Sequence, residues 1–293
     1  MKFTAIPSTV SASLPSALLA AVLVFAFAAC GGGQSGEADT MAEAHETDTP
    51  EPSGMATEPA APVNGENVTY GTIDGEQLNG YTAYPVGAST EALPGVIMIH
   101  EWWGLNDNIR TMARRLAGEG YRVLAVDLYG GRVAETPEAA SELISMVSDN
   151  PTQAVTNLRS AVAFLRETHG APRVGVIGWC FGGGQAANAA AELPTVLDAT
   201  VIYYGFLPTD RERLANIDDP VLGLFGAEDS AIPVEGVRTF EQTLSSLGKD
   251  VEVVIYDGAR HAFANPSGTN YQAEAATDSW VRTVAFFAEH LQG

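Results

Sequence analysis

The chain has 293 residues, of which 46% are hydrophobic, and its formal net charge is −21. A chain of this length can bury one sizeable core and still leave segments outside it. The large excess of acidic residues argues against nucleic acid or an anionic membrane surface as a partner, because both attract basic patches. The spacings C-x-x-C, H-E-x-x-H and G-x-x-x-x-G-K-[ST] do not occur, so the sequence predicts neither a metal site nor a cofactor.

The N-terminus has the pattern of a targeting segment. Lys2 precedes an apolar, alanine-rich run from Leu14 to Ala29, and Cys30 follows directly after small residues. This pattern resembles a bacterial lipoprotein signal, and it predicts a signal peptide over residues 1–29 with Cys30 lipidated. The protein would then be exported and anchored to a membrane by lipid, facing the periplasm or the cell exterior. Ordinary secretion with cleavage nearby and retention as an uncleaved anchor are the alternatives.

A change in composition separates this segment from the rest of the chain. Residues 31–67 are rich in glycine, alanine, proline, threonine and acid, and they contain no lysine or arginine. So little apolar surface cannot offset the entropy lost on ordering, which predicts a disordered acidic tether after Cys30, through residue 67. The folded domain is expected over residues 68–293.

Strand-like and helix-like segments alternate from residue 68 onward. The expected strands are two runs within 68–84, then 96–99, 121–126, 174–177, 199–204, 220–225 and 251–256. The expected helices are 109–116, 135–147, 152–168, 185–192, 233–247 and 271–291. This alternation predicts an α/β protein with a doubly wound, mostly parallel sheet and helices on both faces. Ligands of such sheets bind at the carboxyl ends of the strands.

The segment from Arg173 to Gly184 reads R-V-G-V-I-G-W-C-F-G-G-G. A buried strand, a sharp turn and a helix with G-x-C-x-G at the join have the form of a nucleophile elbow, with Cys180 where serine is usual. Glycines allow the strained turn, and the start of the helix directs free N–H groups toward developing negative charge. A glycine-rich turn around an inert buried cysteine is the alternative.

Two further polar side chains are expected at the carboxyl ends of strands. Asp229 lies in the loop after the strand 220–225, and His261 lies in the loop after the last strand. The order nucleophile, acid, histidine is that of the α/β-hydrolases. A thiol needs a base to become a thiolate, and the base needs a carboxylate to fix its tautomer. The other histidines fit this role less well; they are His45 in the tether, His100 at a strand end, and His169 and His290 at helix ends.

Five motifs occur in one order along the chain: H-E-W-W-G-L-N, D-L-Y-G, G-W-C-F-G-G, G-A-E-D and R-H-A-F-A. Together they resemble the dienelactone hydrolase family, and the resemblance covers about residues 68–293. It implies the α/β-hydrolase fold without a large lid, and hydrolysis of an ester or lactone. Cys180 would attack the carbonyl carbon and form a covalent acyl-enzyme, with His261 and Asp229 completing the triad.

The same resemblance assigns two further roles. The glutamate that matches Glu101 holds the resting thiol and helps to form the thiolate when substrate arrives. The backbone N–H groups of Trp102 and Phe181 would form the oxyanion hole, where each donor contributes about 3–4 kcal/mol to stabilising the transition state.

The chain departs from the family where a substrate carboxylate would bind. Members place one arginine shortly after the histidine motif and another in the helix after D-L-Y. Here Asn265 stands at the first position, and residues 135–150 contain no arginine. Arg132 and Arg260 are the candidate substitutes, although surface positions would also account for them. The expected enzyme is a monomer acting on a small ester or lactone. A general carboxylesterase or thioesterase for small neutral substrates and a catalytically idle binding lipoprotein are the alternatives.

Overall fold

The structure is a computed structural model, which describes residues 40–45, 58–88 and 92–293. The expected signal peptide, residues 1–29, and Cys30 lie outside the described residues. Among the described helices, none combines the length and the apolar character needed to cross a membrane.

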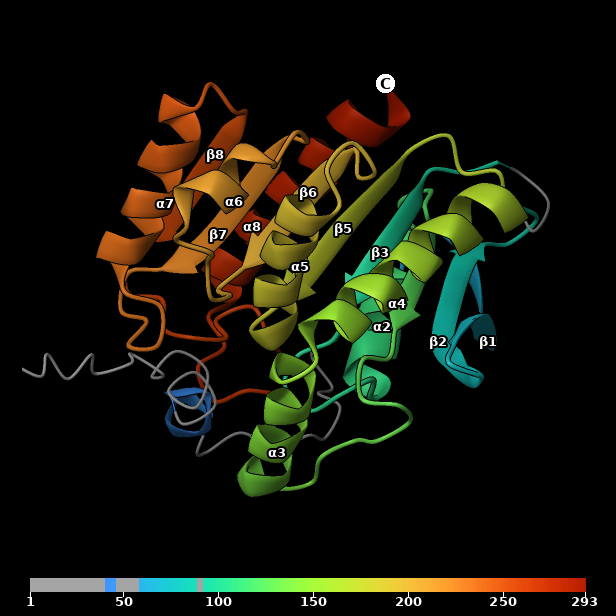
Figure 1. Cartoon of the computed structure of the whole chain (residues 1–293), viewed down its shortest axis with the longest axis horizontal. Helices are drawn as coiled ribbons and strands as arrows, with labels where there is room; N and C mark the ends of the chain where they lie inside the picture. Colours follow the sequence, from blue (N-terminus) through green and yellow to red (C-terminus); the bar gives the residue numbers. More distant parts are fainter. Residues whose placement is uncertain (1–39, 46–57, 89–91) are drawn as a thin grey trace, which may run out of the picture. The chain divides into compact units, whose positions relative to one another are not determined.

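Eight strands form one sheet in the order β1-β2-β4-β3-β5-β6-β7-β8 (Figure 1). They are β1 (Val63–Ile73), β2 (Glu76–Pro85), β3 (Gly95–Ile99), β4 (Arg122–Val126), β5 (Val174–Trp179), β6 (Ala199–Tyr203), β7 (Val221–Gly226) and β8 (Val251–Tyr256). The first two strands form an antiparallel hairpin, and β2 pairs antiparallel with β4. Every other pairing is parallel, which confirms the predicted doubly wound sheet.

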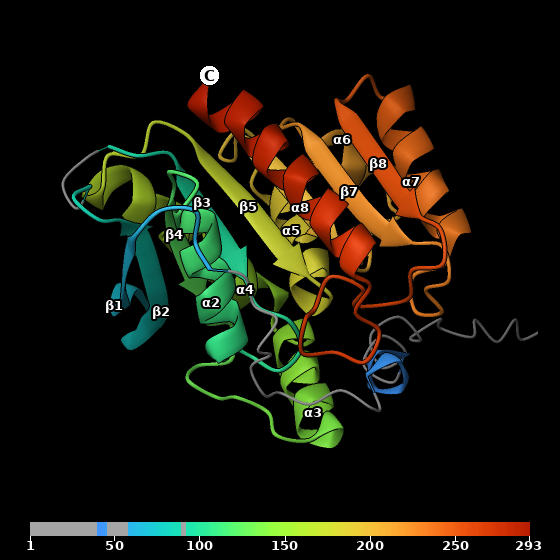
Figure 2. The same cartoon turned by 180° about the vertical axis from the view of Figure 1, so that it is seen from behind.

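Helices cover both faces of this sheet. They are α2 (Asp107–Ala117), α3 (Pro137–Ser148), α4 (Pro151–Ala163), α5 (Phe181–Glu192), α6 (Arg211–Ala215), α7 (Val234–Ser246) and α8 (Ala273–Phe287). Helices α2 and α8 lie over one face (Figure 2), whereas α4, α5 and α7 lie over the other (Figure 1). Helix α6 was not predicted, because five residues are too few to show a helical period; it begins after Asp210, whose side chain accepts a hydrogen bond from the Arg213 N–H.

The central strands supply the core. All residues of β3, β4, β5, β6 and β7 are buried, because helices cover both faces of the parallel part of the sheet. The antiparallel edge strands β1 and β2 are only partly buried. The carboxyl ends of the parallel strands meet at one edge of the sheet, and the expected functional residues follow these ends.

The N-terminal part of the described chain differs from the expectation of a tether without structure through residue 67. Strand β1 begins at Val63 rather than near residue 68, and its first residues pair with the end of β2. The sequence did not predict this part of the strand, because its side chains are mostly polar and show no apolar pattern. An edge strand can carry such side chains, since it exposes them to solvent. Residues 40–44 form a short helical turn, and Met41 and His45 are buried. We refer to residues 40–45 as the N-terminal segment.

Candidate active site

The strand–turn–helix join predicted from the sequence is present, with Cys180 as the single residue between β5 and α5. Its backbone angles, φ 55° and ψ −120°, lie in a region that non-glycine residues rarely adopt, so the turn is strained. A Cβ atom on Gly178 would collide with the backbone of Gly182, and one on Gly182 would collide with carbonyl groups at the end of β3. Glycine at these two positions therefore allows the backbone of the turn to pack closely against the end of β3.

His261 and Asp229 form a buried pair. The two side chains are 2% and 0% exposed, and His261 Nδ1 lies 2.8 Å from Asp229 Oδ2. The other carboxylate oxygen, Oδ1, accepts hydrogen bonds from the backbone N–H groups of Ala231 (2.8 Å) and Ile232 (3.0 Å). A carboxylate held in this way accepts from Nδ1–H, which leaves the lone pair of the imidazole on Nε2. That atom is buried and has no hydrogen-bond partner among the residues that the structure describes.

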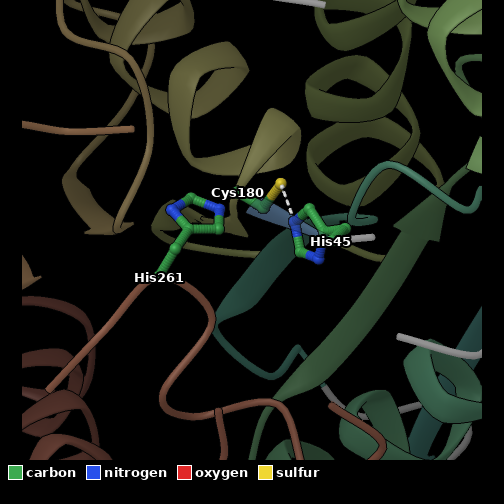
Figure 3. Close-up of side chains that lie close together, drawn as sticks. All are labelled: His45, Cys180 and His261. Atoms are coloured by element: carbon green, nitrogen blue, oxygen red, sulfur yellow. Dashed lines mark hydrogen bonds between the residues drawn. The ribbon is translucent and has the colours of Figure 1, made fainter. Parts of the chain in front are cut away.

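The Cys180 side chain lies between two histidine rings, as Figure 3 shows. Its sulfur is 3.2 Å from His45 Nε2 and 3.3 Å from Met41 Sδ. The reactive atoms of Cys180, His45 and His261 all lie within 4.8 Å of one another. The His45 ring also stacks on Trp102, with ring centroids 4.6 Å apart. The N-terminal segment therefore covers the thiol, and a substrate must displace it to reach Cys180.

The environment of Cys180 keeps the thiol protonated at rest. Burial raises the pKa of the Cys180 thiol well above its usual value, and the negative charge of Glu101 raises it further. Backbone hydrogen bonds from Phe181 and Trp102 to the sulfur act in the opposite direction and lower the pKa. Both N–H groups expected to form an oxyanion hole therefore converge on the nucleophile candidate.

His100 explains the direction of the Trp102 N–H. Its Nε2 accepts a hydrogen bond from the Leu128 N–H (3.2 Å), so Nδ1 carries the proton and donates to the Glu101 carbonyl oxygen at 2.6 Å. Burial lowers the pKa of His100, which keeps the ring neutral. In a trans peptide the C=O and N–H point in opposite directions. Fixing the Glu101 carbonyl therefore aims the Trp102 N–H at Cys180, a role for His100 that the sequence did not reveal.

Glu101 has a partner that the sequence did not indicate. Its Oε2 accepts a hydrogen bond from Asn265 Nδ2 at 2.7 Å. The Cys180 sulfur contacts the N-terminal segment. The Asn265 side chain is itself fixed, because its Oδ1 accepts from the Ser267 N–H at 2.8 Å. The residue that replaces the family's arginine thus orients the glutamate.

The two candidate substitute arginines lie away from this cluster. Arg260 is 66% exposed and faces Glu228 at 3.9 Å, and Arg132 donates from Nε to the Tyr129 carbonyl oxygen at 3.1 Å. Both therefore have surface or local structural roles.

A cavity of about 670 Å³ adjoins the site, with Met41, Phe181 and Phe206 among its lining residues. Because Met41 also touches the Cys180 sulfur, this side chain separates the cavity from the thiol.

Comparison with known proteins places the chain among hydrolases. The model of the dienelactone hydrolase family matches residues 78–291, a range that contains Glu101, Cys180, Asp229 and His261 but not the N-terminal segment. Protein usf of Aquifex pyrophilus is 34% identical over 225 residues, covering 74% of this chain and 96% of that protein. A provisionally named carboxymethylenebutenolidase of Salmonella typhimurium is 34% identical over 231 residues, covering 74% and 84%. A dienelactone hydrolase-like promiscuous phosphotriesterase from metagenomic libraries superposes with a TM-score of 0.71 at 26% identity, covering 78% and 98%.

Proposed function

Because the chain belongs to the dienelactone hydrolase family and is a hydrolase with the α/β-hydrolase fold, we propose that it cleaves small carboxylic esters or lactones through an acyl-enzyme on Cys180. The observation that carries the proposal is the buried His261–Asp229 pair, whose unpartnered Nε2 lies within 4.8 Å of the Cys180 sulfur. This arrangement provides a base with a fixed tautomer next to a thiol that needs one.

In the acylation step, His261 Nε2 accepts the thiol proton as the sulfur attacks the carbonyl carbon. An S–C bond forms, and the electron pair of the C=O double bond moves to the oxygen. In this step the backbone N–H groups of Trp102 and Phe181, which donate hydrogen bonds to the sulfur at rest, stabilise that oxyanion. When the C–O bond to the leaving alcohol breaks, protonated His261 donates its proton to the alcohol oxygen.

In the deacylation step, His261 Nε2 removes a proton from a water molecule that attacks the acyl carbon. The C–S bond then breaks, the acid is released, and the sulfur regains its proton from His261. Asp229 holds the ring through its Nδ1 in both steps and stabilises the imidazolium that forms transiently. Glu101 adds a negative charge near the thiol.

The substrate is a small neutral molecule in this proposal. Asn265 is engaged with Glu101, and Arg132 and Arg260 are directed elsewhere, so none of these residues offers a bidentate contact to a substrate carboxylate. The cavity beside Phe181 supplies room for an acyl or alcohol group once Met41 moves.

The test is a panel of p-nitrophenyl esters, lactones and thioesters, assayed with the full-length protein in detergent and with Cys180→Ala. We expect hydrolysis of short esters or lactones by the parent alone. A catalytically idle binding protein would leave the whole panel intact, and a preference for thioesters would reassign the enzyme as a thioesterase.

We also propose that the protein is exported and anchored through lipid on Cys30, which rests on the apolar run that ends at this residue. Mass spectrometry of the mature protein should show a lipidated N-terminal Cys30, and Cys30→Ala should abolish the modification. An unmodified N-terminus at another residue would contradict the anchor.

A further inference from the structure

The N-terminal segment brings two side chains to the site that ester hydrolysis does not use. Met41 is 1% exposed and His45 is fully buried, although both come from a stretch of acidic and small residues far from the core in sequence. Met41 Sδ lies 3.3 Å from the Cys180 sulfur, and His45 Nε2 lies 3.2 Å from it. Hydrolysis accounts for Cys180 and His261 but gives no reason for these two neighbours.

The four side chains together make a donor set of known preference. A thiolate and a thioether are soft ligands and imidazole is intermediate, and a donor set of this kind selects copper over the hard cations magnesium and calcium. We propose that Met41, His45, Cys180 and His261 form a binding site for a copper ion in the Cu⁺ state. The thioether favours Cu⁺ over Zn²⁺, whose protein ligands are thiolate, imidazole and carboxylate.

The spacing of the donor atoms around the Cys180 sulfur is close to what one ion requires. A metal ion about 2.0–2.3 Å from each donor places neighbouring donors about 3–4 Å apart. The contacts of Sγ with His45 and Met41 fall in this range. His261 Nε2 lies within 4.8 Å of the other two ligand atoms, so its ring needs to approach by about 1–2 Å at most. Figure 3 shows both rings beside the thiol.

A second observation points to a ligand between these groups. His261 Nε2 is buried without a partner and faces the cluster, while Nδ1 is paired with Asp229. Histidines that bind metals usually donate their second N–H to a carboxylate, which fixes the ring and strengthens the ligand. The His45 ring is held by stacking on Trp102. Both imidazoles are therefore oriented before an ion arrives.

Binding requires no redox partner. The S–H bond of Cys180 breaks, a sulfur–copper bond forms, and the proton is released to solvent, while copper stays in the Cu⁺ state. The nitrogen lone pairs of His45 and His261 complete the coordination with Met41 Sδ. Hydrolysis must stop while the ion is bound, because the nucleophile and the base are both ligands. A soft-metal ion would thus hold the N-terminal segment closed over the site.

The test measures copper binding directly. Full-length protein carrying Cys30→Ala, which removes the second thiol of the chain, is titrated with Cu⁺ under anaerobic conditions in competition with a chromogenic Cu⁺ chelator. We expect one ion per chain, and affinity reduced at least about 10-fold by His45→Ala. Met41→Leu should reduce it less, because a thioether is the weakest donor. His169→Ala removes a histidine outside the cluster and should bind as the parent does.

Two results would overturn the proposal. One is equal Cu⁺ affinity of His45→Ala and the parent, which would leave a simple thiol as the binding group. The other is equal affinity of Cys180→Ala and the parent. Thermal unfolding of each variant checks that the fold is retained, and His45→Gln provides a second, more conservative replacement. The binding measurement does not depend on hydrolysis, so an absence of esterase activity would contradict the proposed function and leave the copper site standing.

Discussion

Two carboxylates at the amino ends of the parallel sheet differ in their pairing from two candidate site residues at its carboxyl ends. At the amino ends, Asp198 Oδ2 accepts hydrogen bonds from Arg166 and from the Val174 N–H, both at 2.7 Å. Buried Asp219, also at this edge, accepts one from the Thr200 hydroxyl at 2.5 Å. At the carboxyl ends, Cys180 has a strained backbone, and His261 Nε2 is buried without a partner.

We expect this difference to distinguish carboxylates that stabilise the fold from residues that act on a substrate. A buried polar atom without a partner costs about 1–3 kcal/mol, and a strained backbone conformation costs about the same. Such costs persist where they serve a function and are otherwise removed by pairing. Replacements at the carboxyl ends should therefore change activity with little effect on stability. Replacements at the amino ends should do the reverse.

The largest effect is expected for Cys180→Ala. Removal of the nucleophile should lower kcat by at least about 10⁴-fold, as in other enzymes that depend on one nucleophile. The melting temperature should change little, because the substitution leaves the backbone turn in place and removes one sulfur atom. Ester hydrolysis and differential scanning calorimetry on the same preparation check both statements. Comparable activity of variant and parent would eliminate Cys180 as the nucleophile.

His100→Leu should have the next largest effect. Loss of the donor to the Glu101 carbonyl frees the peptide that carries the Trp102 N–H. We expect kcat to fall about 10- to 100-fold with KM nearly unchanged, less than the about 10²–10³-fold lost when an oxyanion donor is removed outright. His100→Asn places an N–H donor near the position of Nδ1 and should recover most of the loss. Equal defects in both variants would show that His100 only fills space.

At the other end of the sheet, Asp219→Asn should change stability instead of activity. Burial raises the pKa of Asp219 from 3.8 to about 6, so the folded state disfavours its charged form. The folded protein therefore loses stability as the pH rises from about 4 to about 6, by up to about 3 kcal/mol. The asparagine variant should lose this pH dependence and melt several degrees higher than the parent at pH 7. Its kcat/KM should equal that of the parent. A large loss of activity would contradict the expectation that residues at the amino ends of the strands affect stability and not catalysis.

The smallest effect concerns substrate charge. Glu101 and Asp229 are both acidic, and Asn265 stands where the family has an arginine. A neutral ester should therefore be cleaved with about 10-fold higher kcat/KM than a carboxylated analogue of the same size, equivalent to about one lost charge-assisted hydrogen bond. The ratio should decrease at high salt, because screening weakens the repulsion. A preference for the carboxylated ester would point to an anion site elsewhere in the cavity.

Local patterns were sufficient to predict the sheet and the placement of three candidate site residues at the carboxyl ends of its strands. The apolar runs of the central strands, the glycines around Cys180 and the loops that carry Asp229 and His261 all follow from short-range rules. Because the carboxyl ends of parallel strands meet at one edge, these side chains could be expected to converge.

The N-terminal segment could not be predicted in the same way. Met41 and His45 lie in a stretch with no apolar period, and their burial depends on contacts with residues more than a hundred positions away. The hydrogen bond of Asn265 with Glu101 is equally remote in sequence, so the partner of the glutamate was also missed. The contacts of the N-terminal segment and the Asn265–Glu101 hydrogen bond both form between residues that are distant in the sequence. Short-range patterns in one sequence do not predict such pairs.

Trapping of the acyl-enzyme tests the central claim most directly. A slowly hydrolysed p-nitrophenyl ester is mixed with the protein, the reaction is quenched with acid, and the digested chain is analysed by mass spectrometry. We predict that the peptide containing Cys180 gains the mass of the acyl group, and that Cys180→Ala shows no acylated peptide. Hydrolysis that proceeds with the acyl group on another residue, or without any acylated intermediate under these conditions, would contradict the account.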